Sequence, residues 1–355
     1  MTTPPKQKAT EERLVEIRRA AAENAGKPAA SSSPAGSDQR QSGESYYGLP
    51  VLKAPTWTWE VPLYFFFGGI SGVSACIGFV AQIFGSNPAL IHASLWTALI
   101  GAAICPVLLI SDLGRPARFL NMLRVFKIRS AMSVGVWILV TFSGCAFLSV
   151  LSFELIVRGF NNTFLLWLLW LGETSAAVTG LLLASYTGVL IGATAIPVWS
   201  EHRRLIPVHF LTSGLGCSAG ILELAGFLIP ATQTLGYVAA GIETGIGALL
   251  EVRKEAVDGP LHHGQSGWAM RIGGTLEGPV ALLVRLIWSS APAGRFAAAA
   301  CFLIGALISR YAWIWAGRAS AYDPHALFEL QRKKCEASAP AFSRYCARAS
   351  DRFAS

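Results

Sequence analysis

The sequence predicts an all-α integral membrane protein of about eight transmembrane helices. Only 14% of the 355 residues are charged, whereas a soluble domain carries roughly 25%. The mean hydropathy is +0.47, and a chain this apolar cannot stay solvated as a disordered one. The 35 glycines and 11 tryptophans are typical of close helix contacts and of membrane interfaces, respectively.

The first 55 residues form a polar leader without the apolar core that a secretory signal requires. Residues 8–24 are typical of a surface helix, with Thr10 as N-cap before two glutamates. A linker rich in Ser, Pro and Gly follows. Two interpretations stay open: a disordered tail with some helix, or a helix that docks on a partner.

Long apolar runs separated by short polar breaks fill the chain from residue 60 onward. A transmembrane helix needs about 20 apolar residues. The runs that meet this length are 61–84, 89–111, 132–157, 164–198, 205–229, 231–251, 269–290 and 295–317. Breaks this short force neighbouring helices to be antiparallel, which predicts a helical bundle. Residues 319–355 form a polar tail.

Two small-residue pairs with G-x-x-x-G spacing predict close helix contacts within the bundle. Gly68 and Gly72 form the first pair, and Gly241 and Gly245 form the second.

Basic residues concentrate in every second loop, which predicts that both termini and these loops are cytoplasmic. The residues concerned are Arg115, Arg118, Arg124, Lys127, Arg129, Arg203, Arg204, Arg253, Lys254, Arg332, Lys333 and Lys334. The net charge of +8 is therefore mostly a topology signal. No basic patch interleaved with aromatic residues indicates a nucleic-acid partner.

The cysteines and histidines predict no redox centre bound by this chain. The seven cysteines include no C-x2-C pair, so neither an iron–sulfur cluster nor a zinc site is expected. Only His92 and His209 can lie in spans, and the predicted topology places them at opposite ends. We therefore expect no heme, because two axial imidazoles would have to face each other.

Ionisable residues inside spans cost several kcal/mol and mark candidate functional positions. Glu173, Glu223 and Glu243 fall at staggered depths, which favours a proton path, with hydrogen bonding to nearby Ser and Thr as the alternative. Glu277 and Arg310 fall at similar depths and are expected to form a structural ion pair.

Four segments carry a resemblance to a known family. Residues 111–133 contain D-L-G-R-P-x-R-F-x-x-M-L, and residues 46–72 place Y-G-L-P before a Trp-rich start of the first span. Residues 186–199 and 317–332 are also similar to the same family. The chain resembles the NrfD/PsrC family, the membrane subunits of polysulfide-reductase-like complexes, over roughly residues 46–332.

The resemblance implies eight helices in two four-helix bundles, here 56–200 and 201–318. It implies quinone, menaquinone or ubiquinone, bound in the first bundle. It also implies electron exchange with a ferredoxin-like iron–sulfur subunit that is joined to a molybdopterin oxidoreductase or a similar catalytic subunit. Such a chain would bind quinone without completing catalysis alone.

The family places the quinone headgroup near the start of the first helix and the end of the fourth. On this sequence those regions supply Glu60, Tyr64 and Tyr186, with Asp112 and Arg115 from the following loop. A tyrosine hydroxyl donates to a carbonyl, and a carboxylate delivers protons. Some members carry histidine where Tyr64 falls, so Glu60 or Asp112 is the candidate proton donor here.

The basic loop after the second span has competing interpretations. Arg115, Arg118 and Arg124 are candidates for the interface with the iron–sulfur subunit or for plain topology anchors. Asp112 and Arg115 are equally consistent with a structural role.

The predicted location is the inner (plasma) membrane, with the quinone end cytoplasmic by the charge rule. Known family members dock their catalytic subunits on the periplasmic face, so the two signals conflict. Two other functions stay open. Intramembrane carboxylates are also typical of secondary transporters, and a purely structural anchor needs no quinone site.

Overall fold

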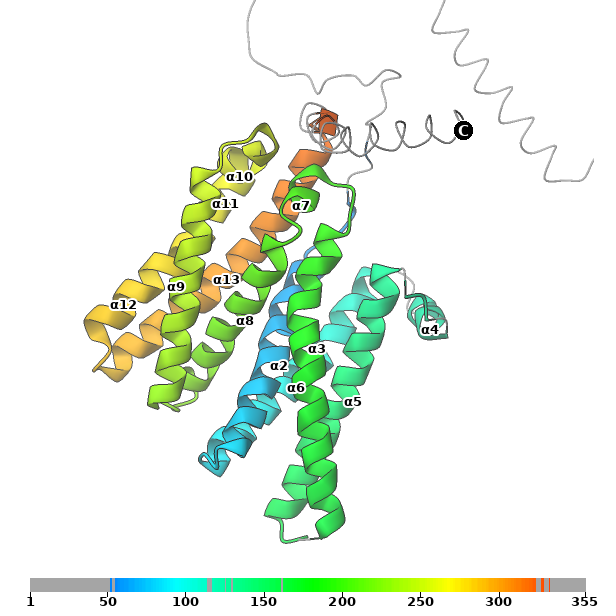
Figure 1. Cartoon of the computed structure of the whole chain (residues 1–355), viewed down its shortest axis with the longest axis vertical. Helices are drawn as coiled ribbons and strands as arrows, with labels where there is room; N and C mark the ends of the chain where they lie inside the picture. The colour runs from blue at the N-terminus through cyan, green and yellow to red at the C-terminus, as the bar shows by residue number, and fades with distance from the viewer. Residues whose placement is uncertain are drawn as a thin grey trace, which may run out of the picture. The chain divides into compact units, whose positions relative to one another are not determined.

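The computed structural model describes residues 55–113, 117–124, 126–128, 130–160 and 162–323, together with Leu52, Leu327, Phe328 and Arg332. This part of the chain consists of helices and contains no strand (Figure 1). Most of the predicted leader and most of the predicted polar tail lie outside the described residues.

The first group of helices contains the four long helices that the sequence predicts. They are α2 (Glu60–Ile83), α3 (Pro88–Asp112), α5 (Ala131–Val157) and α6 (Thr163–Gly192), with short α4 (Ala117–Arg124) between α3 and α5. The predicted turns form: Gly85 and Gly159 adopt positive φ angles of 60° and 96°. Asn87 and Asn162 then cap α3 and α6 by accepting hydrogen bonds from the backbone.

The second group is more interrupted than predicted. It contains α7 (Pro197–Glu201), α8 (Leu205–Leu224), α9 (Pro230–Val252), the 3-10 turn η1 (Ala256–Asp258), α10 (Gly259–His262), α11 (Gly264–Thr275), the π-helical turn η2 (Leu276–Val280), α12 (Ala281–Trp288) and α13 (Pro292–Ala321). The predicted run 164–198 is divided, because α6 ends at Gly192 and Pro197 begins α7.

Seven helices of the described chain are long and apolar enough to cross a membrane. The eighth predicted span, 269–290, corresponds to α11, η2 and α12, which follow one another with a π turn between them. Pro279 lies in that turn, where its missing N–H and its ring prevent a regular α-helical continuation. The result is an all-α membrane protein of about eight spans, one of them interrupted.

Helix α2 has the most central position and packs against α3, α6, α8 and α13. Gly72 faces Gly180 of α6 so closely that a Cβ atom at Gly72 would lie 2.1 Å from the Gly180 carbonyl oxygen. This confirms the predicted close contact at Gly72, whereas a Cβ atom at Gly68, the other member of the first pair, would lie 3.8 Å from its nearest neighbours. The second prediction is wrong for the described chain, because a Cβ atom at Gly241 or Gly245 would have no neighbour within 4 Å.

The distribution of side chains is that of a protein in lipid. Large apolar residues face outward on the long helices, and Val107, Trp167 and Leu171 are 64%, 73% and 63% exposed. The interior instead holds small residues and buried serines such as Ser71, Ser149 and Ser218. Small interior residues allow close helix approach where lipid supplies no hydrophobic driving force between helices.

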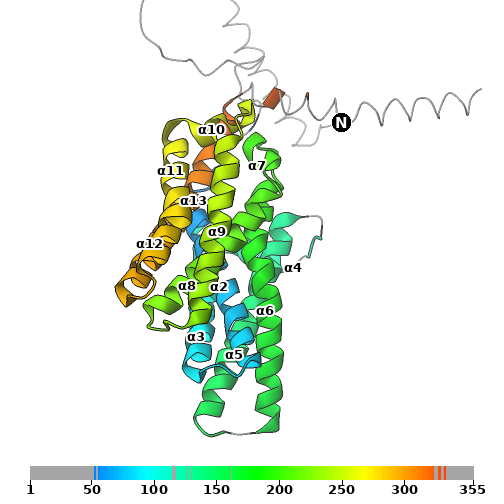
Figure 2. The same ribbon diagram turned by 60° about the vertical axis from the view of Figure 1, so that its left-hand side comes forward.

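The loops predicted to be basic gather at one end of the bundle. α7, α10 and the C-terminal end of α13 lie together in both views (Figures 1 and 2). The start of α2 joins them, because Trp57 stacks on Trp199 of α7 at a ring distance of 5.3 Å. We call this end, which holds residues 193–204 and 253–263, the basic end.

Candidate functional site

Two of the residues predicted to bind quinone lie together in the first group of helices, at the end that adjoins the basic end. Tyr64 of α2 and Tyr186 of α6 line the same small cleft, which has a volume of about 20 Å³. Both side chains are buried. The other residues that line the cleft are Leu109, Leu113, Met132, Gly135, Val136 and Leu190.

The position of Tyr186 depends on two features of α5. Its hydroxyl donates a hydrogen bond to the backbone carbonyl of Ala131. Its ring covers Gly135, where a Cβ atom would lie 2.2 Å from a ring carbon. Only glycine at position 135 leaves room for the tyrosine ring in this orientation.

Two further predicted residues meet beside this cleft, where α2 begins and α3 ends. The hydroxyl of Thr58 contacts the carboxylate of Glu60 and lies 3.3 Å from Oδ1 of Asp112. Glu60 and Asp112 are both half-buried. The structure therefore brings Glu60 and Asp112 to one place, at the end of the bundle where the tyrosine cleft lies.

The predicted arginines are only partly described. Arg115 and the side chain of Arg118 lie outside the described residues. Arg124 is exposed at the last position of α4. An exposed guanidinium there is compatible with a partner interface and with a topology anchor.

A second polar site lies in the second group of helices, and the sequence did not reveal it. His209 of α8 lies between two carboxylates: its Nδ1 is 2.7 Å from Oε2 of Glu243, and its Nε2 is 3.8 Å from Oε1 of Glu277. Ser309 Oγ lies 3.3 Å from Nε2. All four residues are buried. We call His209, Glu243 and Glu277 the carboxylate–histidine cluster.

This cluster opens into the cavity of about 420 Å³ between α9, α10 and α11. The cavity extends from the cluster to Glu251, His262 and Arg271 near the basic end. Glu277 belongs to the π turn η2, an element that is frequent at functional sites. The sequence indicated only the depth of each ionisable residue in its span, and depth alone does not reveal that these residues converge on one cavity.

The predicted ion pair between Glu277 and Arg310 does not form among the described residues. Arg310 instead donates from Nη2 to the carbonyl of Phe210 at 3.1 Å. Its guanidinium carbon lies 3.9 Å from the centre of the Phe210 ring. A backbone carbonyl and an aromatic face thus hold this buried cation.

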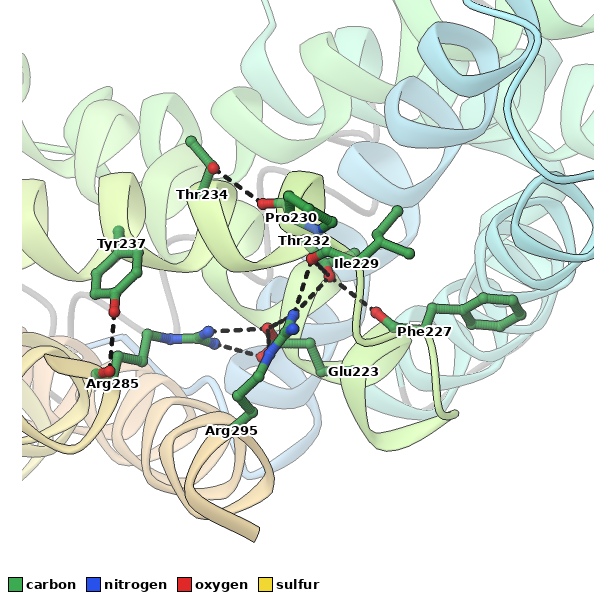
Figure 3. Close-up of polar contacts among 9 residues, drawn as sticks. All are labelled: Glu223, Phe227, Ile229, Pro230, Thr232, Thr234, Tyr237, Arg285 and Arg295. Atoms are coloured by element: carbon green, nitrogen blue, oxygen red, sulfur yellow. Dashed lines mark hydrogen bonds and ion pairs between the residues drawn. The ribbon is translucent and has the colours of Figure 1, made fainter. Parts of the chain in front are cut away.

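The three glutamates predicted as a proton path have different surroundings. Glu223 is fully buried between two arginines, as Figure 3 shows. Arg285 donates to both of its oxygens at 2.9 and 2.7 Å, and Arg295 donates to Oε1 at 3.0 and 2.6 Å. This arrangement favours a structural role for Glu223 over the predicted path.

The other two predicted path residues have free oxygens. Both carboxylate oxygens of Glu173 are buried without a hydrogen-bond partner among the described residues, and so is Oε1 of Glu243. No two of Glu173, Glu223 and Glu243 contact each other directly in the described chain. A single path through all three would need intervening groups.

The two histidines considered for heme each contact a different carboxylate. Nε2 of His92 lies 2.6 Å from Oε1 of Glu154, and the indole of Trp96 donates to the same oxygen at 3.0 Å. A further buried pair, His202 with Asp258 at 2.7 Å, was missed by the sequence because it lies in connecting segments. The intramembrane cysteines are all free thiols: Cys76, Cys105, Cys145, Cys217 and Cys301.

Seven apolar spans, an interrupted eighth and polar groups gathered inside the bundle define an α-helical integral membrane protein. The family model described as "Polysulphide reductase, NrfD" matches residues 52–249. Because this match covers more than half of the sequence, the chain belongs to the NrfD family, which confirms the resemblance noted above. No curated protein matches the chain.

Proposed function

We propose that the chain is the quinone-reactive membrane subunit of a multisubunit oxidoreductase. It passes electrons between a membrane quinone, menaquinone or ubiquinone, and a ferredoxin-like iron–sulfur subunit joined to a molybdopterin oxidoreductase or similar enzyme. The observation that carries this proposal is the meeting of Tyr64 and Tyr186 in one cleft, beside Glu60 and Asp112. All four residues lie within the segment that matches the NrfD family.

The polar groups around the cleft are suited to a quinone, whereas the volume of the cleft is too small for one. Phenol hydroxyls and carboxylates are the groups that bind and protonate a carbonyl. A volume of about 20 Å³ accommodates roughly one water molecule rather than a ring. Met132 lines the cleft and is 44% exposed, and methionine adapts its shape easily. We infer that the ring enters by displacing the Met132 side chain.

The residues around the cleft have separable roles in this proposal. A bound quinone supplies the redox chemistry by exchanging two electrons and two protons. Tyr64 donates to a carbonyl oxygen. Tyr186 shapes the cleft, since its own proton already bonds the carbonyl of Ala131. Glu60 and Asp112 are half-buried at the end of the bundle and transfer protons between the quinone and water.

Binding of the fluorescent quinone analogue HOQNO to the purified chain tests the proposal. Tyr64→Phe and Asp112→Asn should each weaken binding about two- to tenfold, the value of one hydrogen bond. Tyr322→Phe is the matched control, because Tyr322 is 60% exposed and does not line the cleft. Absence of saturable binding, with or without the iron–sulfur partner, would favour the structural-anchor or transporter interpretation.

The partner interface is proposed on the basic loop between α3 and α5, which contains Arg118 and Arg124. Arg124 is exposed and available to an acidic surface. Arg124→Glu should weaken co-purification of the iron–sulfur subunit, more at low than at high salt, because screening reduces surface attraction. Arg158→Glu at the opposite end of α5 is the control.

We propose from the distribution of basic residues that this interface lies on the cytoplasmic face of the inner membrane. Single cysteines placed at Lys127 and at Arg158, labelled in intact cells with a membrane-impermeant reagent, test it. Labelling at position 158 alone supports the cytoplasmic assignment, and labelling at position 127 alone reverses it.

A proton path is proposed through Glu173 in the first group of helices. Its buried carboxylate has no hydrogen-bond partner among the described residues, and such a group either carries a proton or needs water. Glu173→Gln should leave HOQNO binding unchanged while lowering proton translocation by the intact complex in vesicles. Unchanged proton translocation would exclude Glu173 from the path.

A further inference from the structure

We propose that the carboxylate–histidine cluster binds one divalent transition-metal cation of the Zn²⁺ class. His209, Glu243 and Glu277 come from α8, α9 and η2, and each offers one ligand atom. These three atoms all lie within 4.8 Å of one another. Ligands about 2 Å from a tetrahedral ion stand roughly 3.3 Å apart, so small side-chain movements close the site.

The free oxygens of the cluster are the second observation that points to a cation. Oε1 of Glu243 and Oε2 of Glu277 are buried and have no hydrogen-bond partner among the described residues. Both residues are nine-tenths buried or more, at 2% and 1% exposed. Two neighbouring buried carboxylates with free oxygens carry protons, hold water or are balanced by a positive charge, and a bound cation would satisfy both of them at once.

Arg310 supplies only part of that compensation. It is buried within electrostatic reach of both carboxylates, but it donates its hydrogen bond to the carbonyl of Phe210. With a neutral imidazole and both carboxylates ionised, as they would be on binding a metal, the two carboxylates and one guanidinium leave the region one negative charge in excess. A divalent ion therefore meets attraction there, reduced by the arginine.

The donor types select the class of metal. Imidazole favours zinc, copper and nickel over magnesium and calcium, and two carboxylates complete a set of three protein ligands. The site contains no thiolate, so it differs from the cysteine sites that the sequence analysis considered and excluded. One ring nitrogen binds the ion while the other keeps its hydrogen bond, which fixes the imidazole orientation.

The cavity gives the ion an entrance and an open coordination position. It connects the cluster to Glu251, His262 and Arg271. The side chain of Glu251 is 57% exposed at the entrance and pairs with Arg271 at 3.1 Å, so a cation meets no net positive charge there as long as Glu251 is present. Three protein ligands leave the fourth position facing this cavity, the arrangement found in open zinc sites.

Metal titration of the full-length chain, purified in detergent without a histidine tag and stripped with chelator, tests the proposal. Zn²⁺ binding by competition with a fluorescent chelator should give one site per chain. Co²⁺ should give the visible absorption of a low-symmetry site without thiolate charge-transfer bands. Glu243→Gln and His209→Gln should each lower affinity at least about tenfold, the loss that even an outer-sphere partner causes.

His92→Gln is the matched control, because His92 also pairs with a glutamate but belongs to no three-ligand cluster in the described chain. Size-exclusion elution and thermal stability confirm that each variant is folded. If a cluster variant does not fold, Glu251→Gln at the entrance replaces it and should slow Zn²⁺ uptake. Thiolate bands with Co²⁺, affinity unchanged in folded cluster variants, or no stoichiometric binding would each overturn the proposal.

Discussion

The buried charges around Glu223 lead to a strong prediction about stability. Glu223 is 0% exposed and Arg285 is 1% exposed. Glu223 accepts from Arg285 at 2.7 Å and from Arg295 at 2.6 Å. Glu223→Gln keeps the shape of the side chain but leaves two buried guanidinium groups without an anion. Breaking a buried ion pair in this way costs about 3–5 kcal/mol, so we expect a loss of that size in the free energy of unfolding.

Reversible unfolding in mixed detergent micelles, followed by circular dichroism, measures this change. Glu251→Gln is the matched control, because Glu251 pairs with Arg271 at 3.1 Å and both side chains are largely exposed; surface pairs of this kind contribute about 0–1 kcal/mol. If Glu223→Gln changed stability no more than Glu251→Gln does, the reasoning would be refuted, since an alternative anion or water would have to reach the arginines.

Three further predictions concern helix packing and use the same unfolding assay. Gly72→Ala should destabilise by about 1–3 kcal/mol, because its Cβ would lie 2.1 Å from the Gly180 carbonyl oxygen; an unchanged value would mean that α2 and α6 separate freely. Gly241→Ala has no neighbour within 4 Å and should be neutral or stabilise by about 0.5–1 kcal/mol; a loss would reveal a contact absent from this structure. Trp199→Phe removes the 2.8 Å bond from the indole to the Trp313 carbonyl and should cost about 1–3 kcal/mol, whereas no loss would show that the carbonyl finds another donor.

The elements that hydropathy specifies were predictable from the sequence. Span length, tight turns with glycine, and capping asparagines depend on local chemistry, and α2, α3, α5 and α9 start and end within one residue of their predicted limits. Helix α8 ends at Leu224, five residues before the predicted limit of its span. The meeting of Tyr64 with Tyr186 followed from a resemblance rather than from a pattern. No local rule places the end of one helix beside the start of another.

The pairing of buried charges was not predictable. The long helices are apolar on nearly all sides, so the sequence does not indicate which face of each helix points inward. Glu277 was expected beside Arg310 from depth alone, yet it faces His209. Likewise, a separate depth was expected for Glu223, which lies near the end of α8, but its two arginine partners depend on helix rotation.

Because of the π turn η2, the number of residues in this part of the chain determines the direction in which the side chains after the turn point. A π turn closes its hydrogen bond over one residue more than an α turn, so everything after it is rotated by about 100° relative to a continuous helix. Glu277 lies within the turn and Arg285 follows it. Deleting Pro279 would remove both the extra residue and the ring that prevents a regular helix, and would turn Arg285 away from Glu223, although no charged residue would be lost. Homologous sequences that keep Glu277 and Arg285 but differ in the number of residues between them should therefore have different buried ion pairs.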